Sequence, residues 1–233
     1  MSEGNGGSGD VVALAGGVGA ARFLRGLVKR VPPARITAIV NTGDDRSFYG
    51  VHVSPDLDIV TYTLAGRVDN EKGYGLEGDS FAVVETLATH GHETWFRLGD
   101  RDLGTCLHRT IRLGKGAGLA AVSDEIRSNL GVVTRILPMS EDPCPTFVEL
   151  SGNRRAHFEE YLVRDGAPDQ VTAVDLSAAA AAVPAPGVLE ALETASAILI
   201  CPSNPVVSIG PILEVPGIRE AVSARRARAV AIS

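Results

Sequence analysis

The sequence predicts an α/β protein with a mostly parallel sheet flanked by helices, and two observations carry this prediction. The segment "VVALAGG", residues 11–17, is an unbroken apolar run that ends in glycines, as is typical of a strand buried on both faces. Strand patterns and helix patterns then alternate along the chain, which favours parallel strands joined by helical crossovers.

The elements of the first half follow in order. After the glycines, "AARFLRGLVKRV" places apolar residues at helical spacing, and "ITAIVNTGDD" is a second buried strand that runs into an acidic loop. "LDIVTYTLAG" is a helix that Pro55 and Asp56 can start. "SFAVVETLATHG" is a further helix, whose N-terminus Asp79 or Ser80 can cap.

The second half continues the alternation. "GLAAVSDEIRSNLG" is a helix with Gly131 as its C′ residue. "VVTRILPM" and "TFVEL" are strands, "PGVLEALETA" is a helix, "AILICPSNP" is a strand entering a polar loop, and "IREAVSARRARAVAIS" reads as helix, turn and strand. The region of about residues 95–170 is less regular and predicts a helical or mixed insertion.

Composition bounds the domain organisation and the class of protein. Residues 1–10 are rich in Gly and Ser and predict a flexible tail, and residues 11–233 predict a single domain. The net charge of −6 argues against a nucleic-acid partner. The three cysteines form no CxxC motif, and no apolar run reaches the roughly 20 residues of a membrane span. We therefore expect a cytoplasmic protein with reduced thiols and no membrane partner.

The glycine turn "GGVGAAR" predicts a phosphate site. Gly16, Gly17 and Gly19 would let the backbone approach a phosphate at a helix N-terminus, and Arg22 could reach the same anion. The motif is neither a full GxGxxG nor a Walker A sequence, so a tight turn without a ligand remains an alternative.

Four carboxylates, Asp44, Asp45, Asp56 and Asp58, follow the second strand within "NTGDDRSFYGVHVSPDLD". They belong at the sheet edge beside the glycine turn, where Mg²⁺ could join one or two carboxylates to substrate phosphates. A remaining carboxylate could position or deprotonate a hydroxyl nucleophile. Two alternatives stay open, a solvated turn with a helix start and a nicotinamide dehydrogenase that uses Asp44 to hold a ribose.

Two further segments predict ligand-binding loops. "WFRLGDRDLGTCLHRT", residues 95–110, mixes charges with aromatic residues and glycines. "PSNPVVSIGP" places Ser203, Asn204 and Ser208 at a strand end, where small hydroxyls and open amides suit nucleotide phosphates.

Six segments together resemble the 2-phospho-L-lactate transferases, whose actinobacterial members are called phosphoenolpyruvate transferases. They are "LAGGVGAARFLRGL", "NTGDD", "HVSPDLDIVTYTLAG", "WFRLGDRDLGTCLHRT", "LPMSEDPCPT" and "PSNPVVSIGPILEVPGIR", in this order. The resemblance covers residues 11–233 and implies a Rossmann-like fold with an insertion, usually dimeric.

The resemblance also implies an activity in the biosynthesis of coenzyme F420. The family transfers a phosphorylated three-carbon acid (2-phospholactate, phosphoenolpyruvate or phosphoglycerate) from its guanosine diphosphate conjugate to the deazaflavin FO, with Mg²⁺ as cofactor. A ribityl hydroxyl of FO attacks phosphorus, and GMP leaves to give F420-0 or its dehydro form. We expect FO and the guanosine diphosphate-linked acid as partners of a homodimer.

This assigns roles to the candidate residues. The catalytic candidates are Asp58 and Asp45, and the metal candidates are Asp45 and Asp56. By resemblance, Asp58 and Arg97 match positions that contact FO. The guanosine diphosphate would lie on Gly16, Gly17, Gly19, Arg22, Ser203, Asn204 and Ser208.

The resemblance has one departure and one rival. Members of the family continue after "ARAVAIS" with a glycine-rich stretch, so we expect a C-terminal truncation that removes part of the donor pocket. The rival is a non-catalytic, nucleotide-sugar-binding regulator of a related family. Those regulators share the glycine turn and an N-x-G-D-D loop but resemble this chain less at "HVSPDLD" and "LGDRDL".

Overall fold

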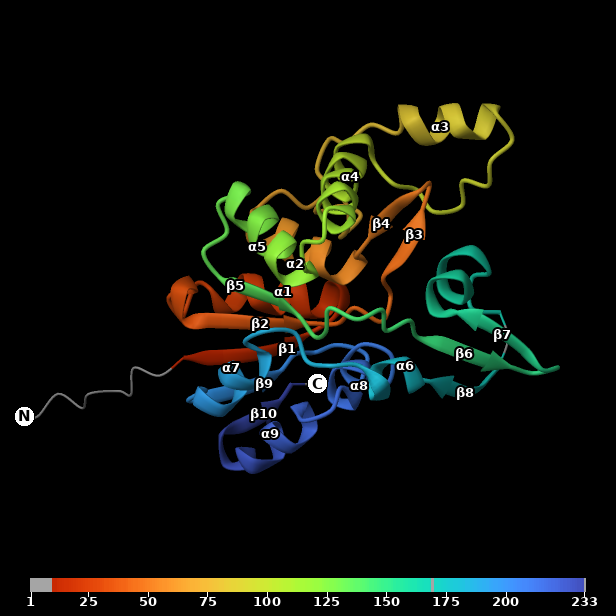
Figure 1. The fold of residues 1–233 in the computed structure, drawn as a ribbon. Helices are drawn as coiled ribbons and strands as arrows, with labels where there is room; N and C mark the ends of the chain where they lie inside the picture. Colours follow the sequence, from red (N-terminus) through yellow and green to blue (C-terminus); the bar gives the residue numbers. More distant parts are fainter. Residues whose placement is uncertain (1–9, 169, 233) are drawn as a thin grey trace, which may run out of the picture.

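A computed structural model describes residues 10–168 and 170–232. Within these residues, five strands form an all-parallel central sheet in the order β10-β9-β1-β2-β5, which confirms the predicted α/β fold (Figure 1). The strands are β1 (Val11–Ala15), β2 (Ile36–Val40), β5 (Arg135–Pro138), β9 (Ala197–Ile200) and β10 (Ala229–Ala231).

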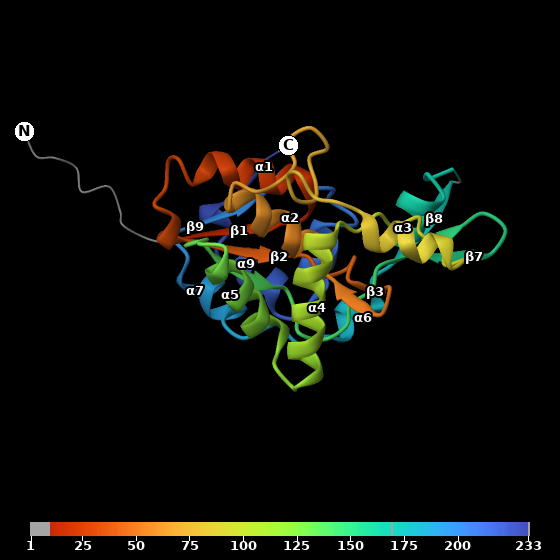
Figure 2. The same ribbon diagram turned by 90° about the horizontal axis from the view of Figure 1, so that it is seen from above.

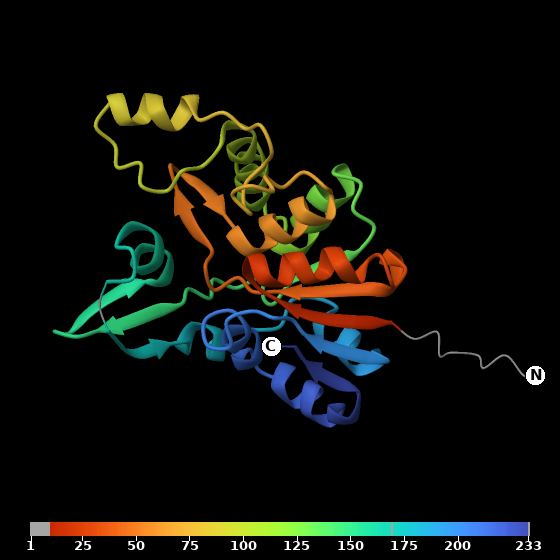
Figure 3. The same cartoon turned by 180° about the vertical axis from the view of Figure 1, so that it is seen from behind.

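Side chains of β1 alternate between two buried layers. Val12 and Leu14 face one hydrophobic cluster, and Ala13 and Ala15 face the other. Helices cover both faces, as Figures 1 and 3 show. One layer contains α1 (Gly17–Leu27), α2 (Pro55–Leu64) and α5 (Leu119–Asn129), and the other contains α7 (Val188–Thr194), α8 (Ile209–Glu214) and α9 (Ile218–Ala224).

A smaller antiparallel sheet projects from one side of the central sheet (Figure 2). It contains β6 (Phe147–Leu150), β7 (Arg154–His157) and β8 (Val171–Asp175), with the π-helix η2 (Glu160–Arg164) after β7 and α6 (Ser177–Ala181) after β8. The irregular region of residues 95–170 is therefore not one continuous insertion, because α5 and the central strand β5 lie inside it.

Among the described residues, the remaining elements are one hairpin, two helices and two short 3-10 helices. They are the hairpin β3 (Arg46–Phe48) and β4 (Val51–Val53), the helices α3 (Ala82–Thr89) and α4 (Asp100–Gly114), and the short η1 (Pro33–Arg35) and η3 (Arg226–Arg228). None of the helices in the described part of the chain is both long and apolar enough to cross a membrane.

Two expectations for the α3–α4 region are wrong. The mixed-charge segment 95–110 is not a loop, because most of it forms α4. Asp79 does not cap α3; its carboxylate accepts bonds from the amides of Arg101 and Asp102 at the start of α4, and Asp100 accepts the Ala82 and Val83 amides of α3. The two helix N-termini lie close together and exchange caps, which sequence adjacency does not reveal.

The turn between β1 and α1 is held by close backbone contacts. Gly17 has φ +67°, which favours glycine. A Cβ atom at Gly19 would lie 2.1 Å from the Pro202 carbonyl oxygen, so α1 presses directly on the loop after β9.

We expect Gly19→Ala to lower the free energy of unfolding by about 1–3 kcal/mol or more, because the backbone carbonyl at Pro202 cannot move aside easily. Gly26→Ala on the same helix is the matched control, since no atom lies within 4 Å of its added Cβ. It should raise stability by up to about 1 kcal/mol through helix propensity. Urea denaturation measures both; equal effects would contradict the close contact.

Candidate active site

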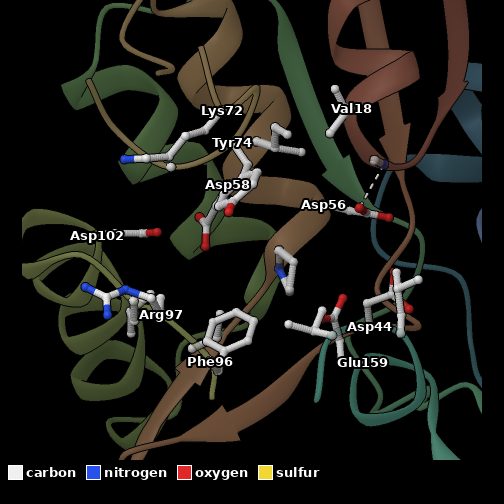
Figure 4. Close-up of a pocket in the computed structure, with 18 of the residues that line it drawn as sticks. Val18, Asp44, Asp56, Asp58, Lys72, Tyr74, Phe96, Arg97, Asp102 and Glu159 are labelled. Carbon is white, nitrogen blue, oxygen red and sulfur yellow. Dashed lines mark hydrogen bonds between the residues drawn. The ribbon is translucent and has the colours of Figure 1, made fainter. Parts of the chain in front are cut away.

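A cavity of about 690 Å³ opens at the carboxyl ends of β1, β2 and β9, where ligands bind in parallel α/β sheets. Its wall combines the β1–α1 turn, the acidic loop, α2, the segment 72–79, the start of α4 and the loop after β9. Figure 4 shows Asp44, Asp56 and Glu159 on one side, Lys72, Arg97 and Asp102 on the other, and Asp58 between them.

Asp56 ties the acidic loop to the glycine turn. Because Pro55 is the first residue of α2, as predicted, Asp56 and Asp58 lie in the first helical turn. The Asp56 carboxylate accepts hydrogen bonds from the Gly17 amide at 2.7 Å and from Asn41 Nδ2 at 2.9 Å. The buried Asn41 side chain also accepts the Gly43 amide, so it sets the shape of the loop after β2.

Three carboxyl groups share this side of the cavity, and the charge of Arg46, which pairs with Glu160, offsets only part of the rise at Glu159. Burial and the charges of Asp56 and Glu159 raise the pKa of Asp44 well above its usual value. Burial also raises the pKa of Asp56 to about 6 and that of Glu159 to about 7, the latter with a contribution from Asp56. Ionising all three is unfavourable unless positive charge arrives.

Asp44 and Asp56 fit a Mg²⁺ ion. Asp44 Oδ1 is buried and has no hydrogen-bond partner among the described residues, so an acceptor atom is left for an external ligand. Mg²⁺ usually takes one or two carboxylates and completes its shell with phosphate and water oxygens. Two carboxylates in an open cavity satisfy that requirement.

Asp45 is absent from the described lining of the cavity, although its Oδ1, like that of Asp44, is buried without a hydrogen-bond partner among the described residues. Its Oδ2 lies 3.0 Å from His52 Nε2 and accepts the Ser54 hydroxyl at 2.7 Å. As a metal ligand or catalytic group Asp45 therefore remains a prediction, and the geometry favours Asp44 for the metal.

Asp58 lines the cavity, and its charge is paired with the buried Arg109 behind the cavity wall. Both Asp58 oxygens accept bonds from Arg109 Nη1 and Nη2, and Arg109 is only 1% exposed. Arg109 Nη1 also donates to the His52 carbonyl at 3.3 Å, which links α4 to α2 and β4. A two-point guanidinium contact fixes the orientation of the carboxylate.

A second acidic group lies next to this pair. Asp58, Asp102 and Cys106 place ligand atoms within 4.8 Å of one another. They fit a metal poorly, because Arg109 already neutralises Asp58 and burial raises the pKa of the Cys106 thiol. Burial, with the charge of Asp58, raises the pKa of Asp102 to about 7, and the Tyr62 hydroxyl donates to its carboxylate at 2.7 Å.

Aromatic side chains form the other end of the cavity. Phe96 stacks on the buried Phe48 ring at 3.9 Å between centroids, and Trp95 meets Phe48 edge-on at 5.2 Å. Trp95 and Phe96 line the cavity together with Phe81, Tyr74 and Phe158. This apolar wall, which Phe48 supports from behind, suits a planar ring system.

The other predicted site residues divide into two groups. Gly17, Arg97, Asn204 and Ser208 line the cavity. Gly16 packs against Ser208, the Ser203 hydroxyl donates to the Gly16 carbonyl at 2.7 Å, and Arg22 lines a separate cavity of about 260 Å³. The ligand roles of this second group, and of the closely packed Gly19, stay predictions.

Several residues of the site were not among the predicted site residues, although Asp102 and Arg109 belong to the predicted binding loop at residues 95–110. Asp102, Cys106 and Arg109 recur at helical spacing on one face of α4, a pattern that a helix assignment would have revealed. Asn41 adjoins a predicted strand end. Nothing in the sequence distinguishes Glu159, which reaches the cavity from the small sheet.

We expect Arg109→Met to cost about 3–5 kcal/mol of stability, because it leaves Asp58 buried and unpaired. Adding Asp58→Asn should recover part of that loss, which chemical denaturation of the single and double variants will show. Arg112→Met, which breaks the exposed pair with Glu125, is the control and should change little. Additive losses in the double variant would contradict the pairing.

Asp102 should make the metal-free protein less stable as pH rises from about 4 to 7. Its folded pKa of about 7 exceeds the unfolded value, so the folded state holds the extra proton, and stability is lost as that proton leaves. The slope attributable to Asp102 approaches about 1.4 kcal/mol per pH unit. The unfolding free energies of wild type and Asp102→Asn, measured in a chelator and plotted against pH, should differ in slope by this amount. Parallel plots would contradict the raised pKa of Asp102.

Comparisons with known proteins identify the family of the chain. Residues 11–233 match the CofD family, described as 2-phospho-L-lactate transferase CofD. A phosphoenolpyruvate transferase of Streptomyces griseus is 49% identical over 217 residues, covering 91% of this chain and 68% of its own length. The counterpart in Nocardia farcinica is 44% identical over 230 residues (96% and 69%). A 2-phospho-L-lactate transferase of Methanosarcina mazei is 37% identical over 221 residues (94% and 72%).

Solved structures show the same fold. Two crystal structures of a protein from Bacillus halodurans, one described as a UPF0052 family member, superpose with TM-scores of 0.63 and 0.66 and are 25% and 27% identical. They cover 93% and 97% of this chain and 66% and 68% of their own chains. The chain thus spans about two thirds of the length of these relatives. Because the family match includes every described element from β1 to β10, the chain belongs to the CofD family of 2-phospho-L-lactate transferases.

Proposed function

We propose that the chain transfers phosphoenolpyruvate from its guanosine diphosphate conjugate to the deazaflavin FO, releasing GMP. One observation carries this proposal: a single cavity joins a helix N-terminus beside buried carboxyl groups, a carboxylate oriented by Arg109, and an aromatic wall. These are the three parts that an anionic donor, a hydroxyl nucleophile and a planar acceptor require.

The donor belongs at the glycine turn. Gly17 and Val18 at the start of α1, with Asn204 and Ser208 from the loop after β9, surround the end of the cavity nearest Asp56. Backbone amides at a helix N-terminus attract phosphate oxygens. Mg²⁺ held by Asp44 and Asp56 would neutralise charge on the diphosphate.

The acceptor belongs on the opposite side. The deazaflavin ring lies against Trp95 and Phe96, and its ribityl chain extends toward Asp58. Arg109 holds Asp58 in the orientation that accepts a hydrogen bond from the attacking hydroxyl. Arg97, which the resemblance assigns to FO, lies on this same side (Figure 4).

The chemistry is one displacement at phosphorus. The ribityl oxygen forms a bond to the phosphorus that bears the three-carbon acid, and the bond from that phosphorus to the GMP oxygen breaks. Asp58 receives the hydroxyl proton, and the electron pair of the broken bond leaves with GMP. The protein contributes positioning and charge neutralisation, which dominate phosphoryl transfer.

Relatives guide the choice of the three-carbon acid. The Streptomyces griseus and Nocardia farcinica proteins named phosphoenolpyruvate transferases are 49% and 44% identical, against 37% for the Methanosarcina mazei 2-phospho-L-lactate transferase. This difference supports enolpyruvate as the group transferred.

The test incubates the chain with FO, Mg²⁺ and the enolpyruvyl, lactyl or glyceryl conjugate, and measures GMP and the phosphorylated deazaflavin. We expect the enolpyruvyl conjugate to react fastest and a chelator to stop the reaction. Asp58→Asn should lower kcat/KM at least about 100-fold, since it removes the proton acceptor. Glu149→Gln, exposed on β6, is the control. Binding of the conjugate without GMP release would instead indicate a non-catalytic nucleotide-binding protein.

A further inference from the structure

Two carboxyl groups meet at the cavity wall where α2 and α4 come together. Asp58, in the first turn of α2, and Asp102, in the first turn of α4, both line the cavity (Figure 4). One carboxylate oxygen of each lies within 4.8 Å of the other. A single oxygen atom between them, from a hydroxyl or a water, spans this distance with two hydrogen bonds of about 2.7 Å. A proton can therefore pass from one carboxyl group to the other at the cavity wall.

Asp58 is poorly placed to keep a proton that it accepts. Both of its oxygens accept bonds from Arg109, whose side chain is buried and cannot turn to solvent. A proton on Asp58 would neutralise the carboxylate and leave the buried guanidinium without its counter-charge, which is costly. Because of this cost, the proton is expected to move on from Asp58 to a neighbouring acceptor.

Asp102 has the features of such an acceptor. The Tyr62 hydroxyl donates to its Oδ1 at 2.7 Å, and the Asp102 amide donates to Asp79 at 3.1 Å, so the side chain and its helix are both held in place. Its Oδ2 accepts no hydrogen bond from the part of the chain that the structure describes, and is open to a proton. Burial, with the charge of Asp58, raises the pKa of Asp102 to about 7, so this group takes up and releases a proton near neutral pH.

The other titratable groups around Asp102 cannot take this part. Burial raises the pKa values of the Cys106 thiol and the Tyr62 hydroxyl, so both groups keep their protons near neutral pH. Both oxygens of Asp79 accept backbone amides at the start of α4. Arg109 is a cation with no acceptor atom. Among the described groups that face Asp58 from α4, Asp102 is therefore the one able to accept its proton.

We propose that the proton of the attacking hydroxyl comes to rest on Asp102, with Asp58 as the relay between them. This inference rests on the proposed function and extends its proton path by one step. The proton passes to Asp58 as the bond from the ribityl oxygen to phosphorus forms, and then to Asp102 Oδ2, so Asp58 regains its charge beside Arg109. The electron pair of the broken bond leaves with GMP, and Asp102 later releases the proton to solvent.

The experiment measures the chemical step against pH. With the chain in excess over the enolpyruvyl conjugate, and with saturating FO and Mg²⁺, GMP release is followed in single turnovers from about pH 5 to about pH 9. We expect the rate to rise about tenfold per pH unit up to about pH 7 and then to level off, because only ionised Asp102 can accept the proton. Asp102→Asn should lower the rate at high pH by about 10- to 100-fold and abolish its dependence on pH. Fluorescence titration should show unchanged binding of FO.

Further variants separate a proton acceptor from a structural role. Tyr62→Phe removes a hydrogen bond that lowers the pKa of Asp102, so the rise of the rate should move to higher pH. Asp56 and Glu159 also have pKa values of about 6 and about 7, and this displacement is what assigns the rise to Asp102. Asp102→Glu keeps an acceptor and should restore the pH dependence at a reduced rate. Asp124→Asn, exposed on α5, is the matched control.

Each other outcome overturns the inference in a recognisable way. If wild type releases GMP at a rate independent of pH, or if Asp102→Asn keeps the wild-type rate and pH dependence, the inference fails and the proposed function stands. If Asp102→Asn is slow but Tyr62→Phe leaves the rise at its wild-type pH, Asp102 supports the structure and takes no proton. If wild type releases no GMP with FO, both the inference and the proposed function fail.

Discussion

The buried ion pair between Asp58 and Arg109 is the contact on which the rest of the site depends. An ionised carboxylate at the wall of an apolar cavity is costly unless a cation compensates it, and Arg109 does so from behind the wall. The same guanidinium bonds to the His52 carbonyl, so α4 is fixed against both α2 and β4. The start of α4 is fixed in turn, and the exchanged caps of α3 and α4 place Phe81 and the adjoining segment at the cavity.

Charge then distinguishes the two ends of the cavity. On the side of the glycine turn, burial raises the pKa values of Asp44, Asp56 and Glu159, the charge of Asp56 adds to the rise at the other two, and the unpaired Asp44 Oδ1 can accept a cation. On the opposite side, Arg109 pairs with Asp58, the start of α4 donates to Asp79, and burial raises the pKa of Asp102, while Lys72 and Arg97 supply positive charge. Such a cavity complements a ligand pair in which metal-bound phosphates meet one end and an electron-rich ring meets the other.

The parts of the fold that the sequence predicts are those that depend on local chemistry. Unbroken apolar strands such as β1 and β2 have few alternatives to the centre of a parallel sheet. Pro55 starts α2, and Gly131 ends α5 with φ +74°, because their backbones favour those positions. The mixed-charge start of α4 resembles a loop in the sequence, since Gly99 and Gly104 are typical of turns and the buried Arg109 pairs with the distant Asp58.

The sequence by itself determined that a glycine turn and an acidic loop follow two neighbouring strands, so phosphate and metal chemistry at one sheet edge could be inferred. Only the tertiary structure decided that Asp44 rather than Asp45 faces the cavity, because that choice depends on His52 and Ser54 binding the second carboxylate. It likewise decided that Arg109 pairs with Asp58 and that Glu159 joins Asp44. These residues are far apart in the chain, and their energies depend on burial, which no local pattern encodes.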